Sequence, residues 1–135
     1  MNQSPVCKNN NLDGRCGSNH YAKFINTLPW THFGTFTTKH ILSLNATRRL
    51  ANGIAFRIPN QRNSIKMFWV AEQFKSGDGY HLHCLINCSE QLFIYQIKNW
   101  YENTHGFCRI LPKNDRASSY LIKNLRHPLS DYGVI

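Results

Sequence analysis

Two apolar runs joined by a glycine-rich turn constrain the fold more than any other part of the sequence. The runs IKMFWVAEQF (65–74) and YHLHCLINC (80–88) are rich in aromatic and aliphatic residues, and SGDG (76–79) lies between them. Runs of this length and composition predict β-strands. The turn residues between them predict that the two strands form an antiparallel hairpin.

Two histidines lie one residue apart on the second strand of this hairpin. Side chains alternate along a strand, so His81 and His83 share one face of the sheet. A His-x-His pair is a weak signal alone, because such pairs also arise by chance. The opposite face of the strand carries the apolar layer expected of a core, which consists of Leu82, Cys84, Ile86 and Cys88.

The hairpin supplies a third polar side chain. If Lys75 pairs with Tyr80, Glu72 lies opposite His83 and on the same face. Two imidazoles and a carboxylate suit a divalent ion such as Mn²⁺ or Mg²⁺, which polarises a phosphate. We therefore predict a metal site at Glu72, His81 and His83. The alternative is a surface ion pair between the carboxylate and one histidine.

The rest of the chain predicts further elements around the hairpin. Their order, β-α-β-β-α-β-α, predicts an α+β fold of the split β-α-β, palm-like or RRM-like type. We expect a central antiparallel sheet of about four to five strands with helices mainly on one face, which leaves the other face open. Residues 1–29 show no sustained period and predict an irregular N-terminal arm. The further elements are strands at 32–38 and 105–113 and helices at 43–56, 89–103 (with Ser89 as N-cap) and 114–127, the last ended by residues 128–135.

The charge and cysteine content narrow the function classes. Sixteen Lys and Arg oppose seven Asp and Glu, for a net charge of +9, which favours a polyanionic partner. Five cysteines at irregular spacing argue against a disulfide scaffold. Cys7, Cys16 and His20 fit no standard zinc pattern. No run of about 18 apolar residues and no signal peptide is evident, so we expect a cytoplasmic chain without a membrane contact.

A candidate nucleophile lies on the predicted last helix. Tyr120 and Lys123 are three residues apart and share one helical face. A phenol with a pKa of about 10 is a poor nucleophile unaided. A polarised phosphate and a nearby cation would stabilise the developing charge. Taken alone, Tyr120 is better explained as a boundary aromatic with its hydroxyl in water, since the chain has six tyrosines.

Three motifs together resemble those of a known family. FGTFTT on the first strand, HLHCLI downstream of Glu72, and YLIK on the last helix resemble, in order, the three motifs of HUH endonucleases. The likeness is to single-tyrosine rolling-circle replication initiators (Rep proteins) of small viruses, phages and plasmids, over about residues 32–127. No second tyrosine lies near Tyr120, and no G-x-x-x-x-G-K-[ST] loop is present. We therefore expect residues 30–135 to form an HUH-type nuclease domain without a helicase domain.

The resemblance implies an activity and a set of roles. Glu72, His81 and His83 match the metal ligands, with Mn²⁺ or Mg²⁺ as cofactor. Tyr120 matches the nucleophile and Lys123 the lysine of the Y-x-x-K motif. The implied reaction is sequence-specific nicking and joining of single-stranded DNA through a 5′-phosphotyrosine intermediate, which initiates rolling-circle replication.

The expected partner is single-stranded DNA, in an origin stem-loop, bound across the open sheet face. Thr35 and Thr37 fall in the first motif and are expected to shape the site or the DNA path. We expect a monomer in the host cytoplasm, or in the nucleus of a eukaryotic host, working with a host or separate helicase. The candidate contacts to the DNA backbone are Lys39, Arg48, Arg49, Lys113, Arg116 and Arg126.

Two other functions fit the same topology. An RRM-like module binds single-stranded nucleic acid without cleavage, and Phe36, Trp69 and Tyr80 would then stack bases. A metal-dependent hydrolase would use water, and Tyr120 would be dispensable. Metal dependence and covalent adduct formation separate these functions from a tyrosine nuclease.

Overall fold

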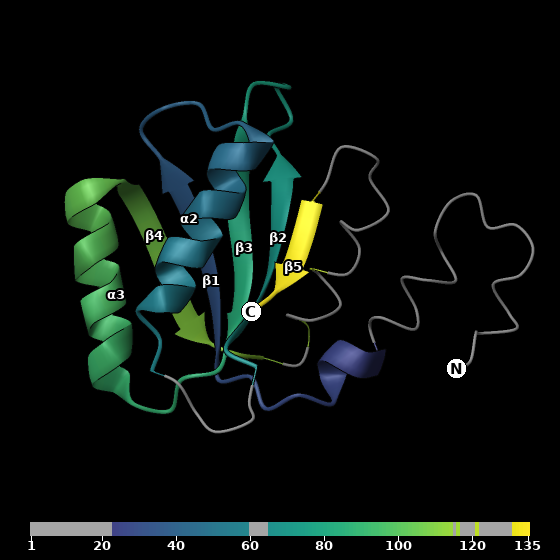
Figure 1. Cartoon of the computed structure of the whole chain (residues 1–135), viewed down its shortest axis with the longest axis vertical. Helices are drawn as coiled ribbons and strands as arrows, with labels where there is room; N and C mark the ends of the chain where they lie inside the picture. The colour runs from purple at the N-terminus through teal and green to yellow at the C-terminus, as the bar shows by residue number, and fades with distance from the viewer. Residues whose placement is uncertain (1–22, 60–64, 115, 117–120, 122–130) are drawn as a thin grey trace, which may run out of the picture.

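A five-stranded antiparallel sheet forms the centre of the molecule (Figure 1). The computed structural model describes residues 23–59, 65–114, 116, 121 and 131–135. The strand order across the sheet is β4-β1-β3-β2-β5, and every neighbouring pair is antiparallel. The predicted α+β class is confirmed. The elements are β1 (His32–Thr38), α2 (Leu44–Phe56), β2 (Met67–Gln73), β3 (Tyr80–Ile86), α3 (Gln91–Thr104), β4 (Gly106–Pro112) and β5 (Asp131–Val134).

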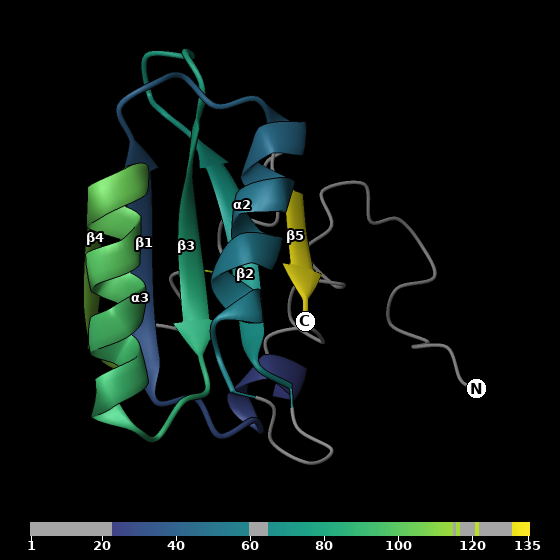
Figure 2. The same cartoon turned by 60° about the vertical axis from the view of Figure 1, so that its left-hand side comes forward.

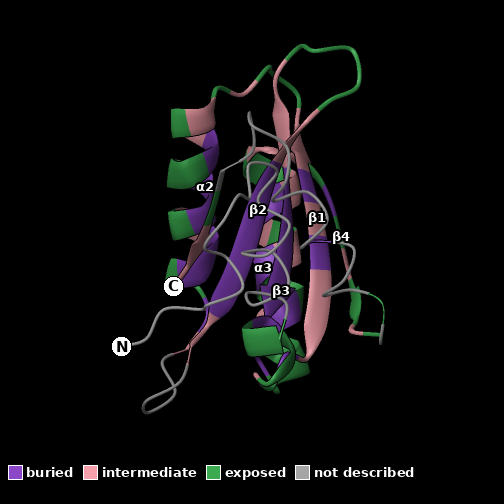
Figure 3. Ribbon diagram, turned by 90° about the vertical axis from the view of Figure 1, so that its right-hand side faces the viewer, coloured by how far each residue is buried: buried purple, intermediate pink, exposed green. Residues whose placement is uncertain are grey.

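Helices α2 and α3 lie on the same face of the sheet (Figure 2). Each helix turns its apolar side toward the sheet. Figure 3 shows this for α2, which is buried on the side that faces the sheet and exposed on its outer side. Ser43 caps α2 because its side chain accepts a hydrogen bond from the Ala46 N–H (3.1 Å). The main core lies between these helices and the sheet, and its largest members include Phe36, Trp69, Leu82, Ile54, Ile97 and Tyr101.

A second apolar cluster covers part of the opposite face of the sheet. It includes Ile25, from a helical turn at residues 23–26, and Trp30, which precedes β1. From the sequence we expect this face to be open, but several strand positions on it are buried. The sequence pattern near residue 25 is too short to indicate which face it covers. The remaining buried members are Phe68, Val70, Leu85 and Leu121.

The hairpin register differs from the predicted one by two residues. Glu72 lies opposite His81 rather than His83. The loop is placed one residue earlier than SGDG, since the Phe74 N–H already donates to the Gly79 carbonyl across it (3.0 Å). Gly79 has a φ of 82°, which favours glycine and helps the chain turn there. A shift by an even number of residues leaves every side chain on its predicted face.

The start of one predicted helix and the C-terminus of the chain need correction. Helix α3 begins at Gln91 with Glu90 as N-cap, and no side-chain capping bond forms, so Ser89 is not the cap. At the C-terminus the sequence predicts only the end of a helix, yet β5 pairs with the edge of β2. Gly133 permits this pairing, because a Cβ there would lie 2.7 Å from the Trp69 indole nitrogen. The predicted helix at 114–127 lies largely outside the described residues.

Candidate metal centre

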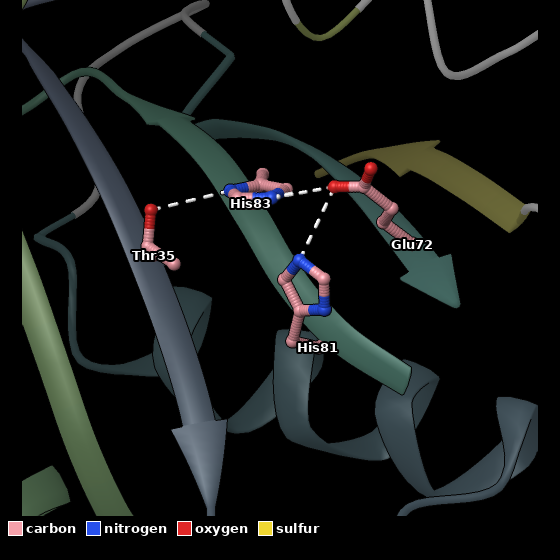
Figure 4. Close-up of polar contacts among 4 residues, drawn as sticks. All are labelled: Thr35, Glu72, His81 and His83. Atoms are coloured by element: carbon pink, nitrogen blue, oxygen red, sulfur yellow. Dashed lines mark hydrogen bonds and ion pairs between the residues drawn. The ribbon is translucent and has the colours of Figure 1, made fainter. Parts of the chain in front are cut away.

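Glu72, His81 and His83 meet on the face of the sheet opposite α2 and α3. Glu72 comes from β2 and the two histidines from β3. The Nε2 atoms of His81 and His83 lie 3.2 Å and 2.8 Å from the same carboxylate oxygen, Oε1 of Glu72 (Figure 4). One ligand atom from each residue lies within 4.8 Å of the others, so the group can hold a metal ion. The structure thus brings together the three residues that the sequence predicts.

A hydrogen bond from β1 orients one of these imidazoles. Thr35 lies directly opposite His83, and its Oγ1 is 3.2 Å from His83 Nδ1. Without an ion, the neutral ring donates its Nε2–H to Glu72 (2.8 Å) and its Nδ1 accepts from the Thr35 hydroxyl. An ion bound at Nε2 would take the place of that proton, and Nδ1–H would then donate to the Thr35 hydroxyl. Metal-binding histidines commonly hold their second nitrogen in this way. The donor set therefore fits a divalent ion on chemical grounds.

The electrostatics favour neutral imidazoles, the form that binds metal. Burial lowers the pKa of His81 below its ordinary value of 6.5, and the Glu72 carboxylate opposes that shift. Burial also lowers the pKa of His83, helped by the charge of His81 and opposed by Glu72. Only 5% of His83 is exposed. Within the described residues, Nδ1 of His81 is buried without a hydrogen-bond partner, so His81 lacks the support that Thr35 gives to His83.

Large side chains that the sequence reasoning missed surround this centre. Arg109 of β4 lies opposite Thr35 and is exposed on the same face. Phe107 lies opposite Thr37 and is 62% exposed. Tyr132 of β5 is 43% exposed, on the same face because it pairs with Val70, which opposes His83 in β3. Alternation along 105–113 would have placed Arg109 and Phe107 on one face, but only the pairing of β4 with β1 sets that face beside the centre.

A further aromatic packs directly on the centre. The Phe74 ring lies 4.5 Å from the His81 ring, centroid to centroid, and remains 38% exposed. The Phe33 ring lies 5.9 Å from the His83 ring. The two histidines therefore sit among aromatic rings as well as polar groups.

A cleft of about 320 Å³ opens beside His83. Arg116, a predicted contact to the DNA backbone, lines this cleft together with His83. Strands β1 and β4 supply its apolar walls. Such a mixture of apolar walls and a few polar groups is typical of ligand sites. The residues that line it include Phe33, Thr35, His83, Leu111, Asn114 and Arg116.

The other predicted nucleic-acid contacts are spread over the molecule. Thr37 shares the face of Thr35, and its hydroxyl donates to the Phe107 carbonyl (3.2 Å). Lys39 is exposed just beyond the end of β1, and Lys113 follows β4. Arg48 and Arg49 belong to α2, which covers the opposite face, so the structure does not bring them to the centre. Tyr120, Lys123 and Arg126 lie outside the described residues.

The prediction of which side chains would stack bases in an RRM-like module is wrong. Phe36 is fully buried and Trp69 is buried, both in the main core under the helices. Tyr80 is half-buried and packs against the same core. The exposed aromatics on the metal-centre face are instead Phe74, Phe107 and Tyr132.

No family model, curated protein or solved structure matches this chain. In the part of the chain that the structure describes, none of the helices has the length and apolar character needed to cross a membrane.

Proposed function

We propose that the chain is a metal-dependent endonuclease that nicks and rejoins single-stranded DNA, with Tyr120 as nucleophile. The observation that carries this proposal is the convergence of Glu72, His81 and His83 on one face of the sheet, at the border between its buried and its exposed parts. This arrangement fits the HUH resemblance of the sequence. Mn²⁺ or Mg²⁺ is the proposed ion, because hard divalent ions suit phosphate chemistry.

The neighbour of Tyr120 supports its role. Leu121 is fully buried in the apolar cluster that contains Val70, and Val70 lies opposite His83. Leu121 follows Tyr120 directly in the sequence, so the burial of Leu121 on this face supports the choice of Tyr120 as the nucleophile.

The surroundings of the centre support a single-stranded nucleic acid as substrate. The chain carries a net charge of +9, and Arg109 and Arg116 lie beside the centre. Exposed aromatic rings, at Phe107 and Tyr132, flank it on both sides along the sheet. Bases of a single strand stack on such rings while cations bind the backbone.

The chemistry is an in-line displacement at phosphorus. A divalent ion bound by Glu72, His81 and His83 would polarise the scissile phosphate as a Lewis acid. The Tyr120 oxygen forms the new P–O bond and loses its proton, while the 3′-oxygen departs and gains one. Lys123 stabilises the negative charge of the transition state. Because the phosphotyrosine is an ester, a 3′-hydroxyl can reverse the step and join strands without ATP.

Covalent capture from a random pool tests this proposal whatever the target sequence is. The pool of single-stranded DNA is incubated with the protein and Mn²⁺, and complexes that survive denaturation are isolated and sequenced. We expect wild type to capture a common sequence and Tyr120→Phe to capture none. Tyr95→Phe is the matched control, since Tyr95 is exposed on α3, which covers the face of the sheet opposite the metal centre. Capture by Tyr120→Phe would overturn the nucleophile, and undiminished capture by Glu72→Gln would overturn the metal centre.

A second candidate function is non-catalytic binding of single strands on the same face. The exposure of Phe74, Phe107 and Tyr132 favours it, since these rings could stack bases without any metal. The same pool separates the two functions. A binding module would retain DNA in chelator and release all of it intact under denaturing conditions.

A further inference from the structure

A second cavity lies on the helix side of the sheet, away from the metal centre. It has a volume of about 290 Å³ and is formed by α2, by the end of α3 and by the segment after β1. Figures 1 and 2 show α2 and α3 on this side of the sheet. Its volume is near the lower end for small-molecule sites, which are about 300–1,000 Å³. The residues used below are Leu42, Arg49, Leu50, Gly53, Trp100 and His105, which all line it.

Gly53 leaves this cavity open. It lies within α2, where glycine destabilises a helix by about 1 kcal/mol relative to alanine. A Cβ at Gly53 would meet only the Trp100 ring, at 3.8 Å, which is an ordinary contact. Neither its backbone conformation nor close packing therefore requires glycine here. The missing side chain leaves space beside the Trp100 ring.

The chemistry of the walls combines an aromatic surface with positive charge. The guanidinium of Arg57 lies 3.5 Å from the centre of the Trp100 ring and donates to the Gly53 carbonyl (3.0 Å). Arg49 lines the cavity directly. Among the residues that the structure describes, neither arginine forms an ion pair with a carboxylate, and no carboxylate lines the cavity.

His105 adds a neutral polar group to the wall. Its ring lies 5.1 Å from the Trp100 ring, and its backbone carbonyl accepts from the Lys39 N–H (3.2 Å). Burial and the charge of Arg57 both lower its pKa. At neutral pH this imidazole can donate and accept hydrogen bonds without adding charge.

We propose that this cavity binds one nucleotide unit. The planar base packs beside Trp100 and between the apolar side chains of Leu42 and Leu50, while the phosphate pairs with Arg49. Arginine recognises phosphate by paired, charge-assisted hydrogen bonds, and tryptophan is a good stacking surface for bases. The site lies on the opposite face from Glu72, His81 and His83, so it is independent of the proposed nuclease centre.

Binding in chelator tests the cavity apart from the metal centre. Calorimetry is carried out in EDTA with deoxyadenosine monophosphate and with a short single-stranded oligonucleotide. We expect Arg49→Gln to weaken binding by about tenfold or more, the effect of one charged hydrogen bond. Gly53→Leu, which fills the cavity, should weaken binding similarly. Arg48→Gln is the matched control, because it removes the same charge from a neighbour that does not line the cavity.

The outcomes distinguish the ligand source and the two proposals. Binding of the mononucleotide supports a free nucleotide, and binding of the oligonucleotide alone, weakened by Arg49→Gln, supports a nucleic-acid segment. If Arg49→Gln and Gly53→Leu bind like Arg48→Gln, or no ligand binds wild type, the inference is overturned. Gly53→Ala guards against misfolding by the larger side chain, since its Cβ fits and favours the helix. The result of covalent capture with Tyr120→Phe tests the proposed nuclease alone and does not affect the conclusion about this cavity.

Discussion

Removal of the Thr35 hydroxyl should weaken metal binding without disturbing the sheet. In Thr35→Val the shape and the strand preference are kept, and the 3.2 Å bond to His83 Nδ1 is lost. A neutral bond of this kind contributes about 0.5–1.5 kcal/mol net. Partners that orient ligands change metal affinity by about 10- to 100-fold. Because this bond is neutral and rather long, we expect about a tenfold loss, or about 1.4 kcal/mol.

Two measurements follow the effect of Thr35→Val. Calorimetric titration with Mn²⁺ gives the affinity, and nitrogen-detected NMR of the metal-free protein gives the tautomer of His83. Thr35→Ser should restore both, since it keeps the hydroxyl. Thr37→Val is the control, because the Thr37 hydroxyl bonds the Phe107 carbonyl instead. An affinity within about twofold of wild type, or an equal loss in Thr37→Val, would refute an orienting role for Thr35.

Three further predictions concern the fold, its pH dependence and the sheet face. Ile25→Ala should lower the free energy of unfolding in urea by about 2–5 kcal/mol, since Ile25 is fully buried, whereas Ile41→Ala, at an exposed site, should stay within about 0.5 kcal/mol. In chelator, stability should fall as the pH drops through about 6.5, because the fold lowers the pKa of His81 and His83 and the unfolded chain takes up protons first; His81→Gln/His83→Gln should flatten that slope. Phe107→Ala should weaken single-strand binding, measured by anisotropy, by about 1–3 kcal/mol and leave the melting temperature unchanged.

The face that carries the metal centre was predictable because strand periodicity is strict. Alternation alone puts His81 and His83 on one face and Cys84 on the other, and the structure agrees. The register was wrong by two residues, since the loop position depends on glycine conformations that the sequence does not specify. The error left Glu72 on the correct face, so the predicted group of three residues survived it. An error of one residue would have separated them.

Long-range pairing was not predictable in the same way. The exposure of Phe107 and Arg109 beside the centre depends on β4 pairing with β1, and nothing local in 105–113 specifies that partner. The edge position of β5 depends on Gly133 fitting against Trp69, which lies far away in sequence. Phe36 is a different case, because alternation with Thr35 would already have assigned it to the core.

The metal-centre face is graded from apolar to polar along the strands, and this gradient explains the burial of the histidines. One cross-strand row, built around Phe33, Leu85 and Phe68, is apolar and adjoins the cluster of Ile25 and Trp30. In the next row His83 borders that cluster and is nearly buried. In the row after it His81 and Glu72 reach the more open part of the face. A group of ligands at such a border keeps its imidazoles neutral by burial, while one side stays accessible to an ion and a phosphate. The cluster that the sequence reasoning missed is therefore part of what makes this centre suitable for metal binding.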